Sequence, residues 1–260
     1  PAEKATAQEA TRKVAFANVL AIQIIAYVVL VALELVPGLM YGDAAKPAAV
    51  PFTIIASLAM VVLLVVFSPF RDGVAGHVNA PTAGLLSPIC ATPVIQGNEI
   101  YPAGLEGGKS FSMEEAWIAG VGGLLIVLII VSFGRQMARE NRTHQIRSLS
   151  HSVVEGVAMI DSSGWCILQV LLPTKHSRAA AMSAASGSTV DMFSNVTTTW
   201  VVAAIVTVLV AVALTVCSYF WHRDADPEPD ARSPWIGLAL LPVLLTGLAV
   251  GLAALAIVVL

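Results

Sequence analysis

Long apolar runs constrain this chain more than any other feature of its sequence. Five segments are apolar over the length that a helix needs to cross roughly 30 Å of hydrocarbon, namely 14–36, 50–67, 116–133, 199–221 and 235–260. Lipid offers the backbone no hydrogen-bond partner, so a crossing segment has to close its hydrogen bonds within a helix. The sequence therefore predicts an all-α integral membrane protein, a single polytopic membrane domain with five transmembrane helices.

The composition also indicates a lipid environment, and it excludes several classes of protein. Charged residues make up only 12% of the chain, whereas a soluble domain uses about 25%. A net charge of −3 argues against binding to nucleic acid, which basic surfaces recognise. The expected partners are the lipid bilayer, with bound lipid, and other membrane subunits, and no cofactor is predicted. A bacterial or archaeal plasma membrane and an organelle inner membrane fit the pattern equally well.

Several residues mark the ends of the apolar runs. The pair Pro37-Gly38 would stop the first helix, and Ser112 with Glu115 forms a capping box that would start the third. Tryptophan favours the headgroup layer of a membrane. Four tryptophans lie at predicted helix ends, Trp117, Trp200, Trp221 and Trp235. We therefore expect these indoles at the membrane interface.

The first long connection, 69–111, is predicted to lie outside the membrane. It contains an apolar stretch, 83–95, that prolines interrupt. Such a stretch fits a re-entrant or surface-lying segment, or a lid buried against a partner. It also fits a sixth crossing, provided that protein shields the backbone groups that proline leaves without partners.

The second long connection, 134–198, is also predicted to be extramembrane. Its part 145–172 is less apolar than the five runs and predicts an amphipathic helix on the membrane surface. The alternative is a polar span over 148–172 that carries Glu155 and Asp161. Two carboxylates inside a membrane would indicate transport, because charge at that depth is costly and is retained for function.

Lysine and arginine do not settle the orientation of a five-span protein. Positive charge gathers on the cytoplasmic side of a membrane protein, but here seven such residues fall on each side. A crossing at 83–95 would change the count to ten against four. Otherwise the dense basic segment 134–147 is the best indication of the cytoplasmic or matrix side.

Few polar residues interrupt the runs. Glu34 lies close to the end of the first run, where it fits either an interfacial anchor or a functional carboxylate, and Gln23 is expected to bond another helix. Small residues at close spacing allow helices to approach one another. They occur in the third and fifth runs, at Gly120, Gly123, Gly247 and Gly251. These faces fit packing within the chain or docking onto another subunit.

Three residues of the second connection share a metal-ligand spacing. His144, His151 and Glu155 would lie on one stripe of a helix, and His151 and Glu155 could reach one ion. A solvated helix face produces the same pattern. The sequence therefore offers these three as candidates for a metal site, with a solvated face as the alternative, and predicts no metal site elsewhere.

The segment 146–173 carries Glu155, Gly156 and a terminal Leu172-Pro173. This order resembles the coupling loop of ABC-importer permeases, but Asp161 stands where the family has a glycine. The resemblance covers about 28 of the 260 residues. It implies a pair of short cytoplasmic helices, including Glu155, Asp161 and Pro173, that would dock on an ATPase subunit.

Three functions follow from these features. The leading hypothesis is a non-catalytic subunit of a larger membrane complex, such as a respiratory, photosynthetic or other oxidoreductase assembly, that packs and positions its neighbours. The first alternative is a transport subunit, such as an importer-like permease with a degenerate coupling loop. The second is a membrane enzyme subunit with an interfacial metal site.

Overall fold

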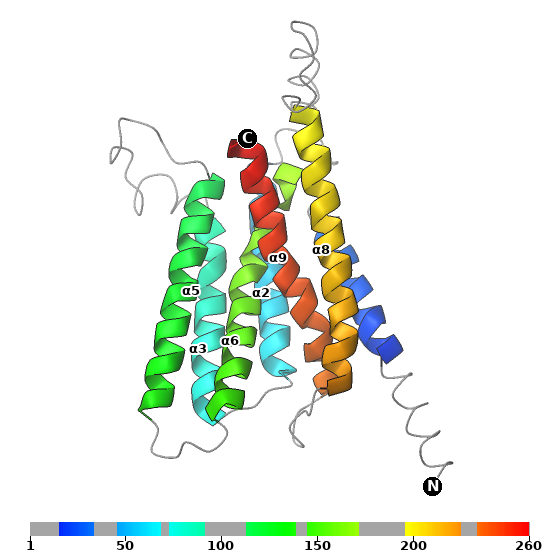
Figure 1. Ribbon diagram of the computed structural model, residues 1–260. Helices are drawn as coiled ribbons and strands as arrows, with labels where there is room; N and C mark the ends of the chain where they lie inside the picture. Colours follow the sequence, from blue (N-terminus) through cyan, green and yellow to red (C-terminus); the bar gives the residue numbers. More distant parts are fainter. Residues whose placement is uncertain are drawn as a thin grey trace, which may run out of the picture.

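The protein is described from a computed structural model that covers residues 16–33, 46–68, 73–91, 113–138, 145–171, 196–224 and 233–259 (Figure 1). All of these parts are helical. The helices are Phe16–Leu33, α2 (Lys46–Val66), α3 (Gly73–Leu86), η2 (Ser87–Ala91), α5 (Met113–Met137), α6 (Gln145–Asp161), η3 (Ser162–Leu171), α8 (Val196–Asp224) and α9 (Pro234–Val259). The short η2 and long η3 are 3-10 helices that continue α3 and α6. The predicted all-α fold is confirmed for these residues.

In the part of the chain that the structure describes, four helices are long and apolar enough to cross a membrane. They are Phe16–Leu33, Trp117–Arg135, Trp200–Arg223 and Pro234–Ile257, and a shorter apolar stretch, Ile54–Val66, lies in α2. All five overlap the predicted runs, and three of them extend one or two residues beyond the predicted ends. The chain is therefore an integral membrane protein.

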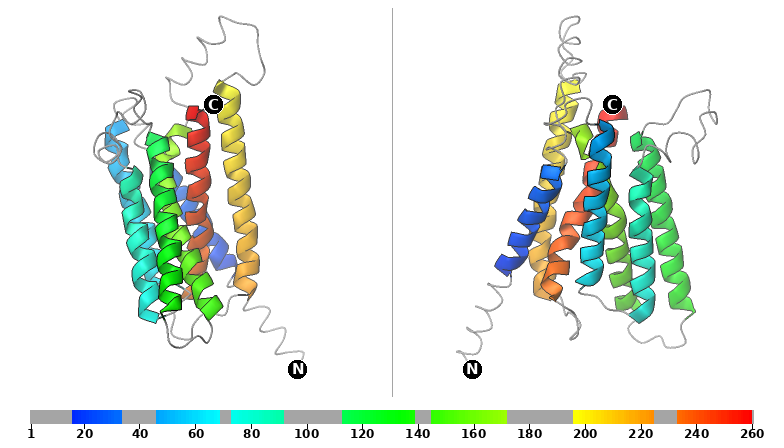
Figure 2. Two further views of the ribbon diagram at one scale, coloured as in Figure 1. Left: turned by 60° about the vertical axis from the view of Figure 1, so that its left-hand side comes forward. Right: turned by 180° about the vertical axis from the view of Figure 1, so that it is seen from behind.

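The helices form one bundle in which successive helices lie roughly antiparallel (Figure 1, Figure 2). The last helix, α9, lies inside the bundle and contacts α2, α5, α6, η3 and α8. In contrast, α8 lies at the edge of the bundle. Only 11% of its apolar stretch Trp200–Arg223 is buried, compared with 61% of the stretch Pro234–Ile257 in α9. The large apolar side chains that α8 leaves exposed fit a surface that faces lipid.

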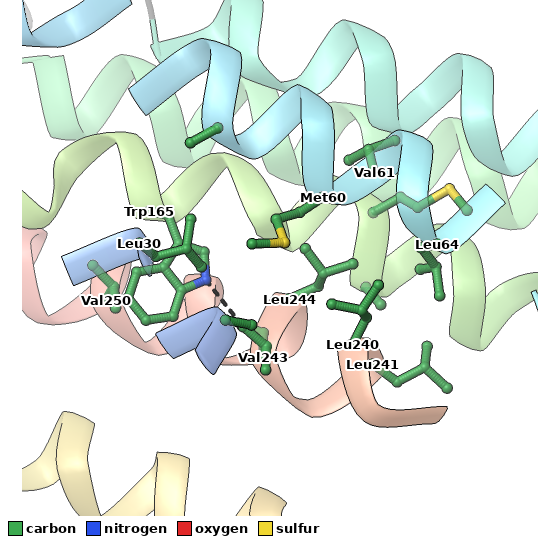
Figure 3. Close-up of a cluster of buried hydrophobic side chains, with 14 of the residues drawn as sticks. Leu30, Met60, Val61, Leu64, Trp165, Leu240, Leu241, Val243, Leu244 and Val250 are labelled. Atoms are coloured by element: carbon green, nitrogen blue, oxygen red, sulfur yellow. Dashed lines mark hydrogen bonds between the residues drawn. The ribbon is translucent and has the colours of Figure 1, made fainter. Parts of the chain in front are cut away.

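Two clusters of buried apolar side chains hold the bundle together. The larger cluster joins α2, η3 and α9, and Figure 3 shows Met60 and Leu64 of α2 facing Leu240 and Leu244 of α9, with Trp165 beside them. The smaller cluster joins α5 to the α6–η3 segment and includes Trp117, Val121, Leu128, Ile160 and Ile167. Since both clusters contain residues of α6 or η3, this segment lies between the two halves of the bundle.

The expectation that 145–172 lies on the membrane surface is wrong. Every side chain from Ala158 to Leu168 is buried, and the segment contacts α2, α3, α5 and α9. The sequence argument failed because serines and glycines made the segment look too polar for an interior position. Inside the bundle, the glycines permit close approach and the hydroxyls bond to backbone and neighbouring side chains.

Part of the connection 69–111 is also helical and packed. The helix α3 and its continuation η2 contact α2, α5 and α6 (Figure 1). Pro81 lies inside α3 and removes one backbone donor without ending the helix. Residues 92–95 of the stretch 83–95 lie outside the described residues. A solvated loop over 73–91 is therefore excluded.

Trp117, predicted to be an interfacial residue, is a core residue of the bundle. It stands near the start of α5, but it is fully buried between α5, η3 and α9. Trp200, Trp221 and Trp235, at the ends of α8 and α9, are half-buried. The position of a tryptophan at the end of an apolar run therefore did not distinguish an anchor from a core residue.

Candidate functional site

Among the described residues, two carboxylates are buried, both on α6. Glu155 is 5% exposed and Asp161 is 1% exposed. Six residues of α-helix separate them by about 9 Å along the axis, and they lie on different faces of the helix. Taking a carboxylate out of water is costly, so its surroundings decide what it can do.

Glu155 is bonded to the end of α2. The hydroxyl of Ser68 donates a hydrogen bond to Glu155 Oε1, and Ser68 is itself buried. Ser68 follows directly after the last turn of α2, which is closed by a bond from Phe67 N to Leu63 O at 3.0 Å. This contact ties α6 to the α2–α3 connection.

We expect Ser68→Ala to lower the free energy of unfolding by about 1–3 kcal/mol, because a buried charged acceptor loses a donor. The measurement is the midpoint of unfolding by SDS in detergent, followed by circular dichroism. In a double-mutant cycle with Glu155→Ala, the two effects should not add, since both variants remove the same contact. Strictly additive effects would show that the Ser68–Glu155 bond contributes nothing.

Asp161 lies deeper, where α6 changes into the 3-10 helix η3. Its Oδ1 is buried and has no hydrogen-bond partner among the described residues. Its carbonyl oxygen lies against Gly247, near the middle of the 26-residue helix α9. Asp161 therefore stands at about half the depth of the bundle, with one carboxylate oxygen left for a ligand or a proton.

The residues after Asp161 are held by hydrogen bonds from two sides. Ser57 of α2 donates to Ser162, with its Oγ 3.1 Å from both the carbonyl oxygen and the Oγ of Ser162. From α5, the indole Nε1 of Trp117 donates to Ser163 Oγ at 3.0 Å. Both serine hydroxyls also donate back to α6, Ser162 to Met159 O and Ser163 to Ile160 O. The polar side chains of this segment are therefore satisfied inside the protein.

On its third side the segment touches the backbone of α9. A Cβ on Gly164 would collide with the carbonyl oxygen of Gly247, and a Cβ on Gly247 would collide with that of Asp161. Trp165 adds a bond from its Nε1 to Val243 O at 2.9 Å. Only two facing glycines allow this approach. We refer to residues 161–165 as the α6–η3 junction.

The 3-10 conformation of η3 is unusually long. It covers ten residues, Ser162–Leu171, whereas 3-10 runs beyond three or four residues are uncommon and often mark a functional hinge. The hydrogen bonds and the glycine contact described above lie at its beginning. Asp161 is thus the last residue before a change of helix type in the middle of the bundle.

A second polar cluster lies between helix Phe16–Leu33, α8 and α9. Gln23 Nε2 donates to Ser218 Oγ at 2.9 Å, so Gln23 bonds another helix as expected. One turn along, the hydroxyl of Tyr27 is 2.8 Å from Thr246 Oγ1, and its ring packs on Trp165 with centroids 5.9 Å apart. The cluster therefore reaches the α6–η3 junction through Trp165.

Four predicted glycines fall into different surroundings. Gly247 and Gly251 of α9 pack inside the chain, against Asp161 and Trp117 respectively. Gly123 of α5 has no atom within 4 Å of the position of its missing Cβ. Gly120 is half-buried. Packing within the chain thus accounts for the glycines of α9 but not for Gly123.

The structure describes two of the three predicted metal ligands, His151 and Glu155. His144 lies outside the described residues, as do Glu34 and Pro173. His151 is half-buried on α6, one turn before the buried Glu155. Within the described ranges, no three His, Cys, Asp or Glu side chains lie close enough to hold a metal ion.

The placement of Glu155 and Asp161 also corrects the coupling-loop interpretation. A coupling loop has to stand at the cytoplasmic surface to reach an ATPase, but both residues are buried in the bundle. The similarity to the permease motif arose from an apolar helix with small residues, which serves packing here. The segment 145–171 is therefore not an exposed docking loop.

Sequence reasoning missed several residues of these clusters. Ser57, Tyr27 and Thr246 lie within apolar runs, where single hydroxyls were given no role. Tyr27 follows Gln23 by four residues, a spacing that places both on one helix face and could have indicated a polar cluster. Trp165 carried no comparable signal, because nothing in the local sequence places it beside α9.

No protein-family model, curated protein sequence or solved structure matches this chain. The chemistry of its own buried residues is therefore the basis for a functional proposal.

Proposed function

We propose that the protein transports protons across the membrane and that Asp161 is the group that binds them. The observation that carries this proposal is a 1% exposed carboxylate whose Oδ1 has no partner among the described residues. A carboxylate at the bilayer centre costs about 2.5–3.5 kcal/mol on insertion scales, so such residues mark ion paths or buried pairs. One carboxylate oxygen is enough to bind a proton, whereas metal cations need several oxygen ligands.

This proposal includes two crossings beyond the five predicted. The segment 73–91 spans about 31 Å at the usual helical rises, and 145–171 spans about 45 Å, which is enough to cross the hydrocarbon. Both lie roughly antiparallel to their sequence neighbours in the bundle (Figure 2). Seven crossings would put Asp161 near the centre of the bilayer.

The distribution of positive charge supports seven crossings. Ten of the fourteen lysines and arginines then fall on one side, Lys4, Arg12, Lys13, Arg71, Arg135, Arg139, Arg142, Arg147, Arg223 and Arg232. Five crossings leave the count tied. The positive-inside rule makes the richer side cytoplasmic, or the matrix side in an organelle.

Reconstituted liposomes test the proposal. With a potassium diffusion potential and a pH-sensitive dye inside, the wild-type protein should acidify or alkalinise the lumen according to the sign of the potential. Asp161→Asn should reduce the rate to that of protein-free liposomes, because the amide cannot take up the proton. Asp224→Asn, the same change at the end of α8, should keep the wild-type rate. Equal rates for wild-type protein and empty liposomes would refute proton transport.

A second function, the non-catalytic subunit of a larger complex, rests on a different observation. The outer face of α5 carries Ala119, Gly123 and Ile126, which are exposed, and a Cβ added at Gly123 would meet no described atom of another helix within 4 Å. Such a face would accommodate a helix of another subunit. Extraction in a mild detergent followed by native mass spectrometry would detect a stoichiometric partner, and a homogeneous monomer would exclude this function.

A further inference from the structure

Three helices of the bundle lose their regular α pattern near the α6–η3 junction. At Ser87, α3 changes into the 3-10 helix η2, and at Ser162, α6 changes into η3. The third helix, α9, contains Pro242 in its interior. Helices bend at prolines, and a 3-10 stretch inside a helix often marks a hinge. All three helices run in the same direction through the bundle (Figure 1).

Contacts between these helices place the three interruptions at one depth. The hydroxyl of Ser87 donates to the carbonyl oxygen of Met159, in the last turn of α6, at 3.3 Å. On the other side, Trp165 Nε1 donates at 2.9 Å to the carbonyl oxygen of Val243, the residue directly after Pro242. The interruptions therefore form a single layer across α3, α6 and α9, which we call the interruption layer.

Serine hydroxyls supply donors to carbonyl oxygens of the interruption layer. In a continuous α-helix, the donor to Gly84 O would be the nitrogen of Pro88, which carries no hydrogen, and the Ser87 hydroxyl donates to that oxygen at 3.0 Å. In α6, the hydroxyl of Ser162 donates to Met159 O at 2.7 Å. Both bonds stay within one turn, so the segment that follows can tilt without leaving these buried carbonyl groups unpaired.

We propose that the interruption layer is a hinge, about which η2, η3 and the part of α9 after Pro242 tilt together and open Asp161 toward the non-cytoplasmic side. The segment η3 contacts both η2 and α9, which makes the three a single body. They extend to the end of the bundle at which α9 ends, whereas α5, with Arg135 in its last turn, ends at the opposite, basic end (Figure 2). This inference rests on the proposed function, because a transported proton has to reach Asp161, which is 1% exposed in the structure.

The thiol of Cys166 reports the opening without any transport assay. Cys166 belongs to η3, lies five residues after Asp161, is in no disulfide and is 2% exposed. The full-length protein in lipid vesicles is treated with a water-soluble maleimide on both sides of the membrane. Peptide mass spectrometry then gives the fraction of Cys166 that is modified over time. Since a buried thiol reacts only when its surroundings open, this rate follows the population of the open state.

Pro88→Ala combined with Pro242→Ala should lower the Cys166 rate by about tenfold or more, because bending then has to break two regained backbone hydrogen bonds. Pro81→Ala is the matched control, since Pro81 lies inside α3, six residues before the interruption layer, and its replacement should leave the rate unchanged. A double variant that failed to fold would instead raise the rate. The SDS midpoint of the double variant should equal or exceed that of the wild type.

Equal Cys166 rates in the wild-type protein and the double variant would overturn the hinge. Proton flux into liposomes provides the second readout, and it should fall in the double variant but not in Pro81→Ala. A lower Cys166 rate with unchanged flux would overturn the part of the hinge in transport. A wild-type protein without flux would overturn the proposed function, and the Cys166 rates would still decide whether the hinge exists.

Discussion

Gly247→Ala should strongly destabilise the bundle, whereas Gly123→Ala should stabilise it. The added methyl at Gly247 would collide with the carbonyl oxygen of Asp161, which is backbone and cannot turn away. Overpacking costs about 1–3 kcal/mol, and we expect the upper end or beyond because α6 and α9 would have to separate. At Gly123 no atom lies within 4 Å of the new methyl, and alanine is favoured over glycine in a helix by up to about 1 kcal/mol.

The two variants form a matched pair, because the chemical change is the same. The SDS concentration at the midpoint of unfolding, followed by circular dichroism, should be lower than that of the wild type for Gly247→Ala. For Gly123→Ala it should be higher or unchanged. Gly164→Ala should behave like Gly247→Ala, since a methyl there would collide with Gly247 O. Similar midpoints for all three variants would contradict the close contact between η3 and α9.

Trp117→Ala should destabilise the protein by about 3–5 kcal/mol, the usual cost of removing a large aromatic side chain from a core. The indole is fully buried, packs against Gly251 of α9 and donates to Ser163. A surface anchor in the headgroup layer would lose much less. The result therefore distinguishes the core position from the interfacial position that the sequence predicted.

Trp117→Phe separates packing from hydrogen bonding. Phenylalanine keeps most of the apolar volume but removes the donor to Ser163, so we expect a loss of about 1 kcal/mol. Unfolding is again measured with SDS and circular dichroism, because Trp fluorescence changes with the substitution itself. Equal losses for Trp117→Ala and Trp117→Phe would show that the packing of the ring that phenylalanine retains contributes little.

Local sequence identified some residues of the candidate site but not their hydrogen-bond partners. Glu155 and Asp161 stood out as carboxylates in a partly apolar segment, and Gln23 as an amide in an apolar run. The partners of Glu155 and Gln23 did not stand out, because Ser68 and Ser218 are separated from them by 87 and 195 positions of the chain. Hydrogen bonds between residues so far apart depend on which helices become neighbours, and no local pattern records that.

The sequence by itself determined that this protein lies in a membrane and where its long apolar helices are. Helix length and side-chain polarity are local properties, and they decide directly whether a segment is stable in hydrocarbon. Only the tertiary structure decided that 145–171 lies inside the bundle rather than on a membrane surface. Its serines and glycines are unfavourable against lipid but favourable where α2, α5 and α9 supply hydrogen-bond partners and backbone contact. Those partners exist only after the helices have packed.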